Sequence, residues 1–152
     1  MKWLAINSNL HHEIYELWTT KDKLLTVNYH REKGTLRITS NNEKRVFLIG
    51  KEGFLRTRTV LRNEYGIRMG QLYHESIEDN QGRIEIYDEE FNYLVQNNFP
   101  RRTAIYKDAE MLVVCELPPD SQSNNLLILL LCWYISAAVE KQPNSYPVEA
   151  YA

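Results

Sequence analysis

The chain has 152 residues, of which 43% are hydrophobic and 25% charged, and its formal net charge is −2. This composition is that of one globular domain long enough to bury a substantial core, and it excludes an intrinsically disordered chain. A net charge so close to zero also argues against a protein dominated by phosphate-backbone contacts, so we expect no nucleic-acid ligand.

Up to about residue 118 the sequence predicts short strands separated by turns. Residues 25–29 and 35–39 alternate apolar with polar side chains, and Gly34 between them suits a hairpin turn. Further turns are predicted at Asn41-Asn42 and at residues 50–53. Turn residues recur about every ten residues, which is typical of an all-β sandwich or barrel. The eleven predicted strands are residues 2–6, 12–19, 25–29, 35–39, 44–50, 54–62, 66–74, 83–88, 91–96, 103–107 and 111–117.

The strands are followed by a fully apolar segment, residues 126–139. Polar residues that can cap a helix precede it and Pro143 follows it, so we predict a helix over about residues 124–141. A helix that is apolar on every face is buried either in protein or in lipid. Fourteen residues span roughly 21 Å, against about 30 Å of bilayer hydrocarbon. The length therefore favours a helix in the protein core, with a short membrane tail anchor as the alternative.

A core helix sets the width of the barrel around it. A helix with its side chains is about 10–12 Å across, so the sheet that encloses it needs more than the eight strands that just fill with their own side chains. The predicted fold class is mainly β with one C-terminal helix, in a closed antiparallel barrel of about 11–12 strands around a central hydrophobic helix. This single domain covers residues 1–142, and residues 143–152 form a C-terminal tail.

This layout resembles the tubby-like superfamily, which includes tubby C-terminal domains, LURP-one-related proteins and phospholipid scramblases. The strings Arg-Val-Phe-Leu-Ile-Gly at residues 45–50, Asn-Glu-Tyr-Gly-Ile-Arg-Met-Gly at 63–70 and Arg-Ile-Glu-Ile-Tyr-Asp at 83–88 are similar to that group. The resemblance implies a barrel of roughly twelve strands around the C-terminal helix. The chain lacks the arginine- and asparagine-containing signature of tubby domains and the cysteine-rich segment and calcium motif of scramblases. Their ligand sites are therefore not transferred to this sequence.

The charges are unevenly distributed along the chain. Residues 31–68 contain ten Lys and Arg against four Glu, whereas residues 75–90 contain seven acids against one Arg. In the predicted strand 54–62, alternation places Arg56, Arg58 and Arg62 on one face, where three guanidinium groups could bind an anionic headgroup or phosphate. The alternative is that these arginines are solvated, or paired across strands with the acidic segment.

No catalytic or metal-binding pattern emerges from the remaining candidates. We interpret Asp88, Glu89 and Glu90 as a solvated turn, and the pairs around His12 and His74 are too sparse for zinc. Cys115 and Cys132 lie in apolar runs and are expected to be buried thiols. Without a nucleophile elbow or a Gly-rich phosphate loop, we expect a non-enzymatic protein with no cofactor.

We expect this protein to reside in the cytoplasm, because the N-terminal apolar stretch is too short for a signal peptide. The expected partners are an anionic membrane surface, bound peripherally, or another protein. The alternative function is a small tail-anchored membrane protein whose β domain faces the cytosol.

Overall fold

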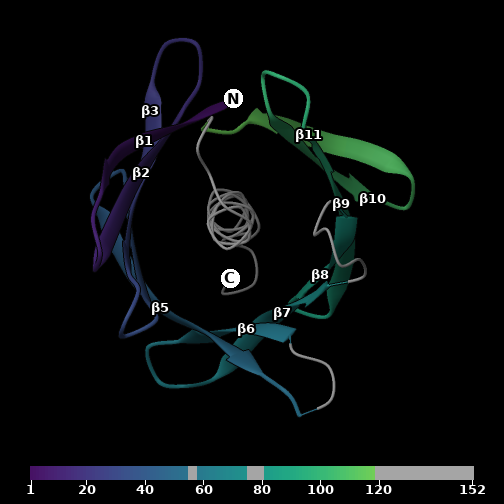
Figure 1. The fold of residues 1–152 in the computed structure, drawn as a ribbon. Coiled ribbons are helices and arrows are strands. Elements are labelled where there is room, and N and C mark those ends of the chain that lie inside the picture. The colour runs from purple at the N-terminus through teal and green to yellow at the C-terminus, as the bar shows by residue number, and fades with distance from the viewer. Residues whose placement is uncertain (55–57, 75–80, 119–152) are drawn as a thin grey trace, which may run out of the picture.

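The computed structural model describes residues 1–54, 58–74 and 81–118, and within them the chain forms eleven strands and no helix (Figure 1). The predicted strands are confirmed in number and order. They are β1 (Lys2–Ser8), β2 (His12–Trp18), β3 (Lys23–His30), β4 (Thr35–Ser40), β5 (Glu43–Glu52), β6 (Arg58–Asn63), β7 (Arg68–His74), β8 (Gln81–Ile86), β9 (Glu89–Gln96), β10 (Arg102–Lys107) and β11 (Glu110–Glu116).

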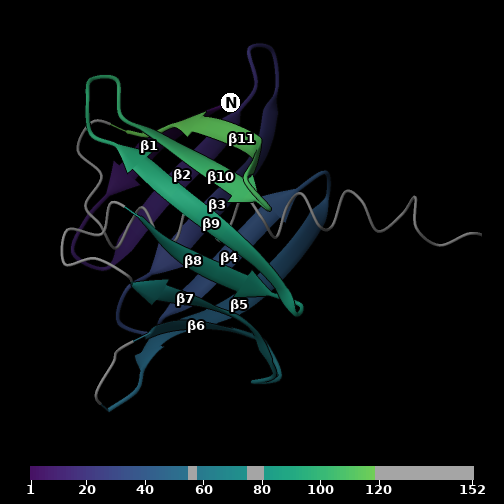
Figure 2. The same cartoon turned by 90° about the vertical axis from the view of Figure 1, so that its right-hand side faces the viewer.

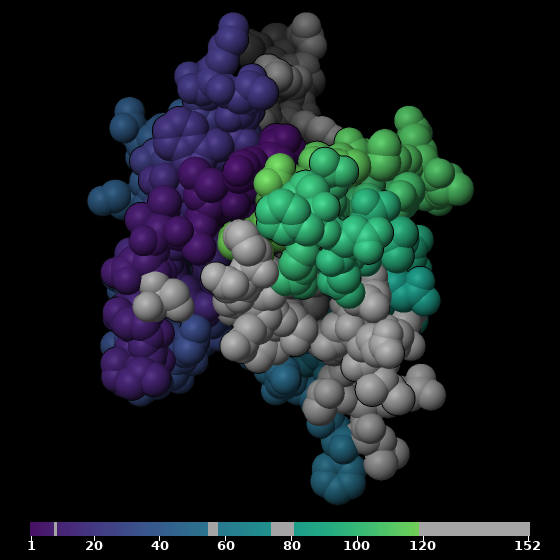
Figure 3. All heavy atoms as spheres, turned by 45° about the horizontal axis from the view of Figure 1, so that its top comes forward, coloured from purple at the N-terminus to yellow at the C-terminus, as the bar shows by residue number. Residues whose placement is uncertain are grey.

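The strands form a closed barrel in which each strand pairs with the next along the chain. All these pairs are antiparallel, but β1 and β11 meet in parallel, with Lys2 opposite Glu116. The prediction of a wholly antiparallel barrel is therefore wrong at this seam. The reason is parity: an up-and-down barrel with an odd number of strands begins and ends with strands that run the same way. The amide of Glu116 donates to the carbonyl of Met1 at 3.0 Å, and Figure 3 shows the first and last strands side by side.

The connections lie at two ends of the barrel. One end, here called the β1–β2 end, has the connections β1–β2, β3–β4, β5–β6, β7–β8 and β9–β10, and the opposite β2–β3 end has the other five. Figure 2 shows the β9–β10 connection on the left and the β8–β9 and β10–β11 turns on the right. Three turns at the β2–β3 end have two successive residues with positive φ, as type I′ hairpins require: Asn41-Asn42, Tyr87-Asp88 and Asp108-Ala109.

Alternate residues of each strand point into the barrel and form its apolar lining. The buried cluster contains Trp3, Tyr15, Leu17, Leu25, Val27, Leu36, Ile38, Phe47, Leu61, Leu72, Ile84, Ile86, Phe91, Tyr93, Val95, Ile105, Cys115 and Leu117. A Cβ added at Gly82 would lie 2.7 Å from the ring of Tyr93, so the tyrosine ring covers the backbone where β8 has no side chain.

The predicted turn at residues 50–53 begins later than expected. Strand β5 continues to Glu52, and Gly50 pairs with Val60 inside the sheet. The predicted helix at residues 124–141, the tail at 143–152, Arg56 and Cys132 lie outside the described residues. Among the residues that are described, no helix is long and apolar enough to cross a membrane.

Candidate functional site: a basic pocket on the outer wall

The outer surface of β2, β3 and β4 contains a pocket of about 280 Å³. Strand register assembles it, because His12 pairs with His30, His30 with Thr35, and Asn28 with Arg37. Residues directly opposite each other in adjacent strands face the same side of the sheet. Six polar residues therefore line the pocket: His12, Asn28, His30, Lys33, Thr35 and Arg37.

Hydrogen bonds hold the two imidazoles at the centre of the pocket. The rings of His12 and His30 meet edge to face with their centroids 4.4 Å apart. His12 Nδ1 lies 3.3 Å from Asn28 Oδ1, and the amide of Lys33 donates to His30 Nδ1 at 3.3 Å. Because its Nδ1 accepts, neutral His30 has its proton on Nε2, which leaves an N–H donor for a ligand.

The pocket has positive charges and no carboxylate in its lining. Lys33 and Arg37 are exposed, and within the described part of the chain neither forms an ion pair. The lining also offers the Thr35 hydroxyl and the Asn28 amide as neutral hydrogen-bond donors. Two cations without an ion pair in the described chain, the Nε2–H of neutral His30 and two neutral donors in one hollow are suited to an anion.

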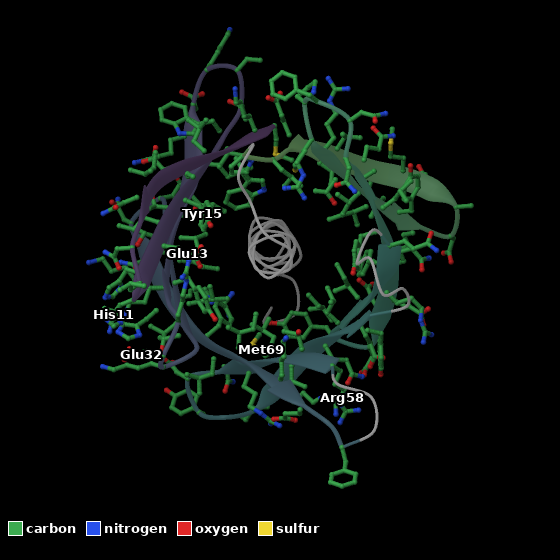
Figure 4. All side chains as sticks on the ribbon, in the orientation of Figure 1. His11, Glu13, Tyr15, Glu32, Arg58 and Met69 are labelled. Carbon is green, nitrogen blue, oxygen red and sulfur yellow. The ribbon has the colours of Figure 1, made fainter. Side chains whose placement is uncertain are left out.

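A buried carboxylate lies behind the pocket, on the inner face of β2. Glu13 is 1% exposed, accepts a hydrogen bond from the Tyr15 hydroxyl at 2.9 Å, and bonds Arg31 Nε at 3.1 Å (Figure 4). The bond to Glu13 raises the pKa of Arg31, and burial followed by the charge of Glu13 raises the pKa of Tyr29. This ion pair holds Arg31 in place. Because Arg31 begins the β3–β4 turn, the pair also positions the turn that contains Lys33.

The acid of the β3–β4 turn itself, Glu32, is also paired with another residue. Glu32 Oε1 lies 2.8 Å from His11 Nδ1, and both side chains are labelled in Figure 4. Glu13 and Glu32 are thus bound elsewhere, and neither neutralises Lys33.

The structure places two of the three predicted arginines on the outer wall, with Arg58 opposite Glu52 and Arg62 opposite Leu48. Arg62 Nη2 bonds both carboxylate oxygens of Glu52, at 2.8 and 3.1 Å. That bond lowers the pKa of Glu52. The partner of Arg62 is therefore an acid of the adjacent strand, not of the acidic segment 75–90.

Arg58 has a different environment. It pairs across the sheet with Tyr73, which pairs in turn with Arg83, whose guanidinium lies 5.0 Å from the Tyr73 ring centre. The Nε atom of Arg58 is buried and has no hydrogen-bond partner in the structure. Arg58 and Arg62 thus lie on the same face of β6, but Arg62 binds Glu52 whereas Arg58 lies opposite Tyr73.

The acidic turn predicted at residues 88–90 is divided between ion pairs and solvent. Asp88 lies in the β8–β9 turn, while Glu89 bonds Lys107 at 3.3 Å and Glu90 lies 3.6 Å from Arg83. Among the described residues, no three His, Cys, Asp or Glu side chains gather in a way that could hold a metal ion. Cys115 is buried as expected, and burial raises the pKa of its thiol to about 11.

The sequence reasoning missed the basic pocket. The alternation of residues 25–29 and 35–39 predicts two strands but no site on their polar positions, and His30 and Lys33 lie beyond the predicted strand 25–29. The signal in the sequence is that polar residues alternate at Asn28 and His30 and at Thr35 and Arg37. Pairing the hairpin strands in register places these residues, together with His12, on one face of the sheet.

No family model, curated protein or solved structure matches this chain. The site must therefore be interpreted from its own geometry.

Proposed function

We propose that this protein is a non-enzymatic binding domain that holds an anionic group, a phosphate or a carboxylate, in the pocket of β2–β4. The observation that supports this most directly is that Lys33 and Arg37, which form no ion pair in the described chain, share a hollow with the Nε2–H donor of His30 and with no acid in the lining. Charge-assisted hydrogen bonds to an anion are roughly twice as strong as neutral ones, so such a lining favours anions over neutral ligands.

The geometry favours this pocket over the predicted arginine stripe. Arg62 is already bound to Glu52 by two oxygens, and an incoming anion would have to displace that carboxylate. Lys33 and Arg37 have no such competitor among the described residues. The stripe of Arg56, Arg58 and Arg62 remains a second candidate for the same class of ligand.

Titration with inorganic phosphate, followed by amide chemical shifts, tests the proposal. We expect shifts centred on the six lining residues. A Lys33→Gln/Arg37→Gln double variant should lose at least about tenfold in affinity, since each lost charge-assisted bond costs more than 1.4 kcal/mol. The matched control, Arg58→Gln/Arg62→Gln, should bind phosphate as the wild type does. Loss of binding in that control instead would assign the anion to the stripe, and no shift at millimolar phosphate would overturn the proposal.

We also propose that residues 126–139 form a helix that fills the barrel, as the tubby-like layout implies. A barrel of eleven strands is wider than the eight that close on their own side chains, and its inner wall is apolar. Leu129→Asp should then abolish folding, because a buried unpaired carboxylate costs several kcal/mol. A variant that stays folded, together with wild-type protein that resists carbonate extraction from membranes, would instead support the tail anchor.

A further inference from the structure

The β1–β2 end of the barrel exposes three large apolar side chains. Leu10 in the β1–β2 connection is 82% exposed, Phe54 after β5 is 100% exposed, and Phe99 in the β9–β10 connection is 88% exposed. Single exposed apolar residues are ordinary on protein surfaces. Three from separate connections at one end of a barrel form an apolar set that nothing in the described structure covers.

Charge distinguishes this end from the opposite one. The β2–β3 end also exposes apolar groups, Tyr65 at 80% and Ile67 at 62%. Its turns, however, contain four acids against the single cation Lys21, whereas the described turns of the β1–β2 end contain three cations against the single acid Glu32. The four acids are Asp22, Glu64, Asp88 and Asp108, and the three cations are Arg31, Lys33 and Arg101. The β2–β3 end would be repelled by an anionic surface.

At the β1–β2 end the described acids are all engaged. Glu13 binds Arg31, Glu32 binds His11, Glu52 binds Arg62, and Glu116 lies 3.6 Å from Lys2. Lys33, Lys51 and Arg102 have no ion pair within the described residues. The connection between β7 and β8 contains three further acids in its sequence, Glu75, Glu78 and Asp79. The cations without an ion pair, Lys33, Lys51 and Arg102, therefore belong to the rest of this end, from β9–β10 through β1–β2 to β5–β6, which is here called the basic arc.

The basic pocket lies beside this arc. His12 is the first residue of β2, two positions after Leu10, and His30 and Lys33 lie where β3 enters its turn. If Leu10, Phe54 and Phe99 reach the boundary between headgroups and acyl chains, the pocket therefore lies at the level of the lipid phosphates. Aromatic and leucine side chains are favoured at that boundary, and cations near it gain from anionic lipids.

We propose that the β1–β2 end docks on an anionic bilayer, with Leu10, Phe54 and Phe99 inserted at the interface and the basic pocket on a lipid phosphate. The proposal rests on the proposed function, for which it names the lipid surface as the source of the anion.

Flotation with phosphatidylcholine vesicles, with and without phosphatidylserine, tests it. Wild-type protein should float with the anionic vesicles and less so as salt rises. Phe54→Ser/Phe99→Ser should reduce the partition coefficient at least about tenfold, because two buried phenyl groups are lost. The matched control Tyr65→Ser/Ile67→Ser removes exposed apolar groups from the opposite end and should partition as the wild type does.

The outcomes separate this proposal from the previous one. If phosphate binds in solution but the Phe54→Ser/Phe99→Ser variant floats like the wild type, the docking proposal is overturned and the anion site stands. If flotation depends on both phenylalanines while Lys33→Gln/Arg37→Gln has no effect, docking stands and the pocket does not bind the lipid phosphate. Wild-type protein that does not float with either vesicle overturns docking, and a protein partner then becomes the better interpretation of the three side chains.

Discussion

The carbonyl oxygen of Gly34 accepts a hydrogen bond from the amide of Ile49 at 2.7 Å, which brings the β3–β4 turn against the backbone of β5. Gly34 has a φ of +60°, and a Cβ there would collide with the carbonyl oxygen of Ile49. Both the backbone conformation and the close approach thus require glycine at this position.

Alanine substitutions at three glycines separate these two effects. Gly50 has open space around a Cβ and no positive φ, whereas Gly66 has open space but a φ of +79°. We expect Gly50→Ala to change the free energy of unfolding by less than about 0.5 kcal/mol and Gly66→Ala to cost about 1–2 kcal/mol. Gly34→Ala should cost about 2–4 kcal/mol, because a steric collision adds to the strain. Urea unfolding measures all three, and equal losses at Gly34 and Gly66 would contradict the role of the contact.

The buried carboxylate of Glu13 predicts a contrast between two cations of one turn. Arg31→Met leaves Glu13, 1% exposed, with the Tyr15 hydroxyl but without its cation, and should cost roughly 2–4 kcal/mol of unfolding free energy. Lys33→Met removes an exposed charge with no ion pair in the described chain and should cost less than about 0.5 kcal/mol. Phosphate affinity should show the reverse order. A Lys33 variant as unstable as the Arg31 variant would contradict the assignment of Arg31 to stability and of Lys33 to anion binding.

The strands were predictable because their physical cause is local. Alternation of apolar and polar residues over five or so positions, interrupted by Gly34 or Asn41-Asn42, needs only the chain itself. The parallel seam was also within reach, since an odd strand count dictates it.

The pocket and the partner of Arg62 depended on register, which is a non-local property. Glu52 lies in the basic run of the sequence, and pairing of β5 with β6 brings it next to Arg62. A register shifted by one residue would move every side chain of a strand to the other face. Turn geometry, as at residues 31–34, decides that register, and residue types alone do not determine it.

The ion pair of Glu52 with Arg62 predicts an acid dependence of stability. Arg62 lowers the pKa of Glu52, first through the hydrogen bond, so the carboxylate stays ionised to lower pH in the folded chain than in the unfolded one. The pair therefore stabilises the fold at neutral pH, and this stabilisation is lost as the pH falls through the lowered pKa of Glu52. NMR titration of the Glu52 carboxyl should give a higher midpoint in Arg62→Gln than in the wild type. Identical midpoints would show that the pair does not persist in solution.

The thiol of Cys115 should be nearly inert in the folded protein. Burial raises its pKa to about 11, so at pH 8 on the order of one molecule in a thousand has the reactive thiolate. The thiol also lies on the inner wall at 1% exposure, where a reagent cannot reach it without local opening. We therefore expect slow modification by a disulfide reagent in buffer and rapid modification in urea.

A Cys132→Ser variant isolates this signal, because it leaves Cys115 as the single thiol of the chain. Unfolding should restore an ordinary thiol and remove the delay. A fast reaction of the folded variant near neutral pH would show that the inner wall at β11 is open to solvent, and would contradict a closed seam between β1 and β11 as well as the burial of Cys115.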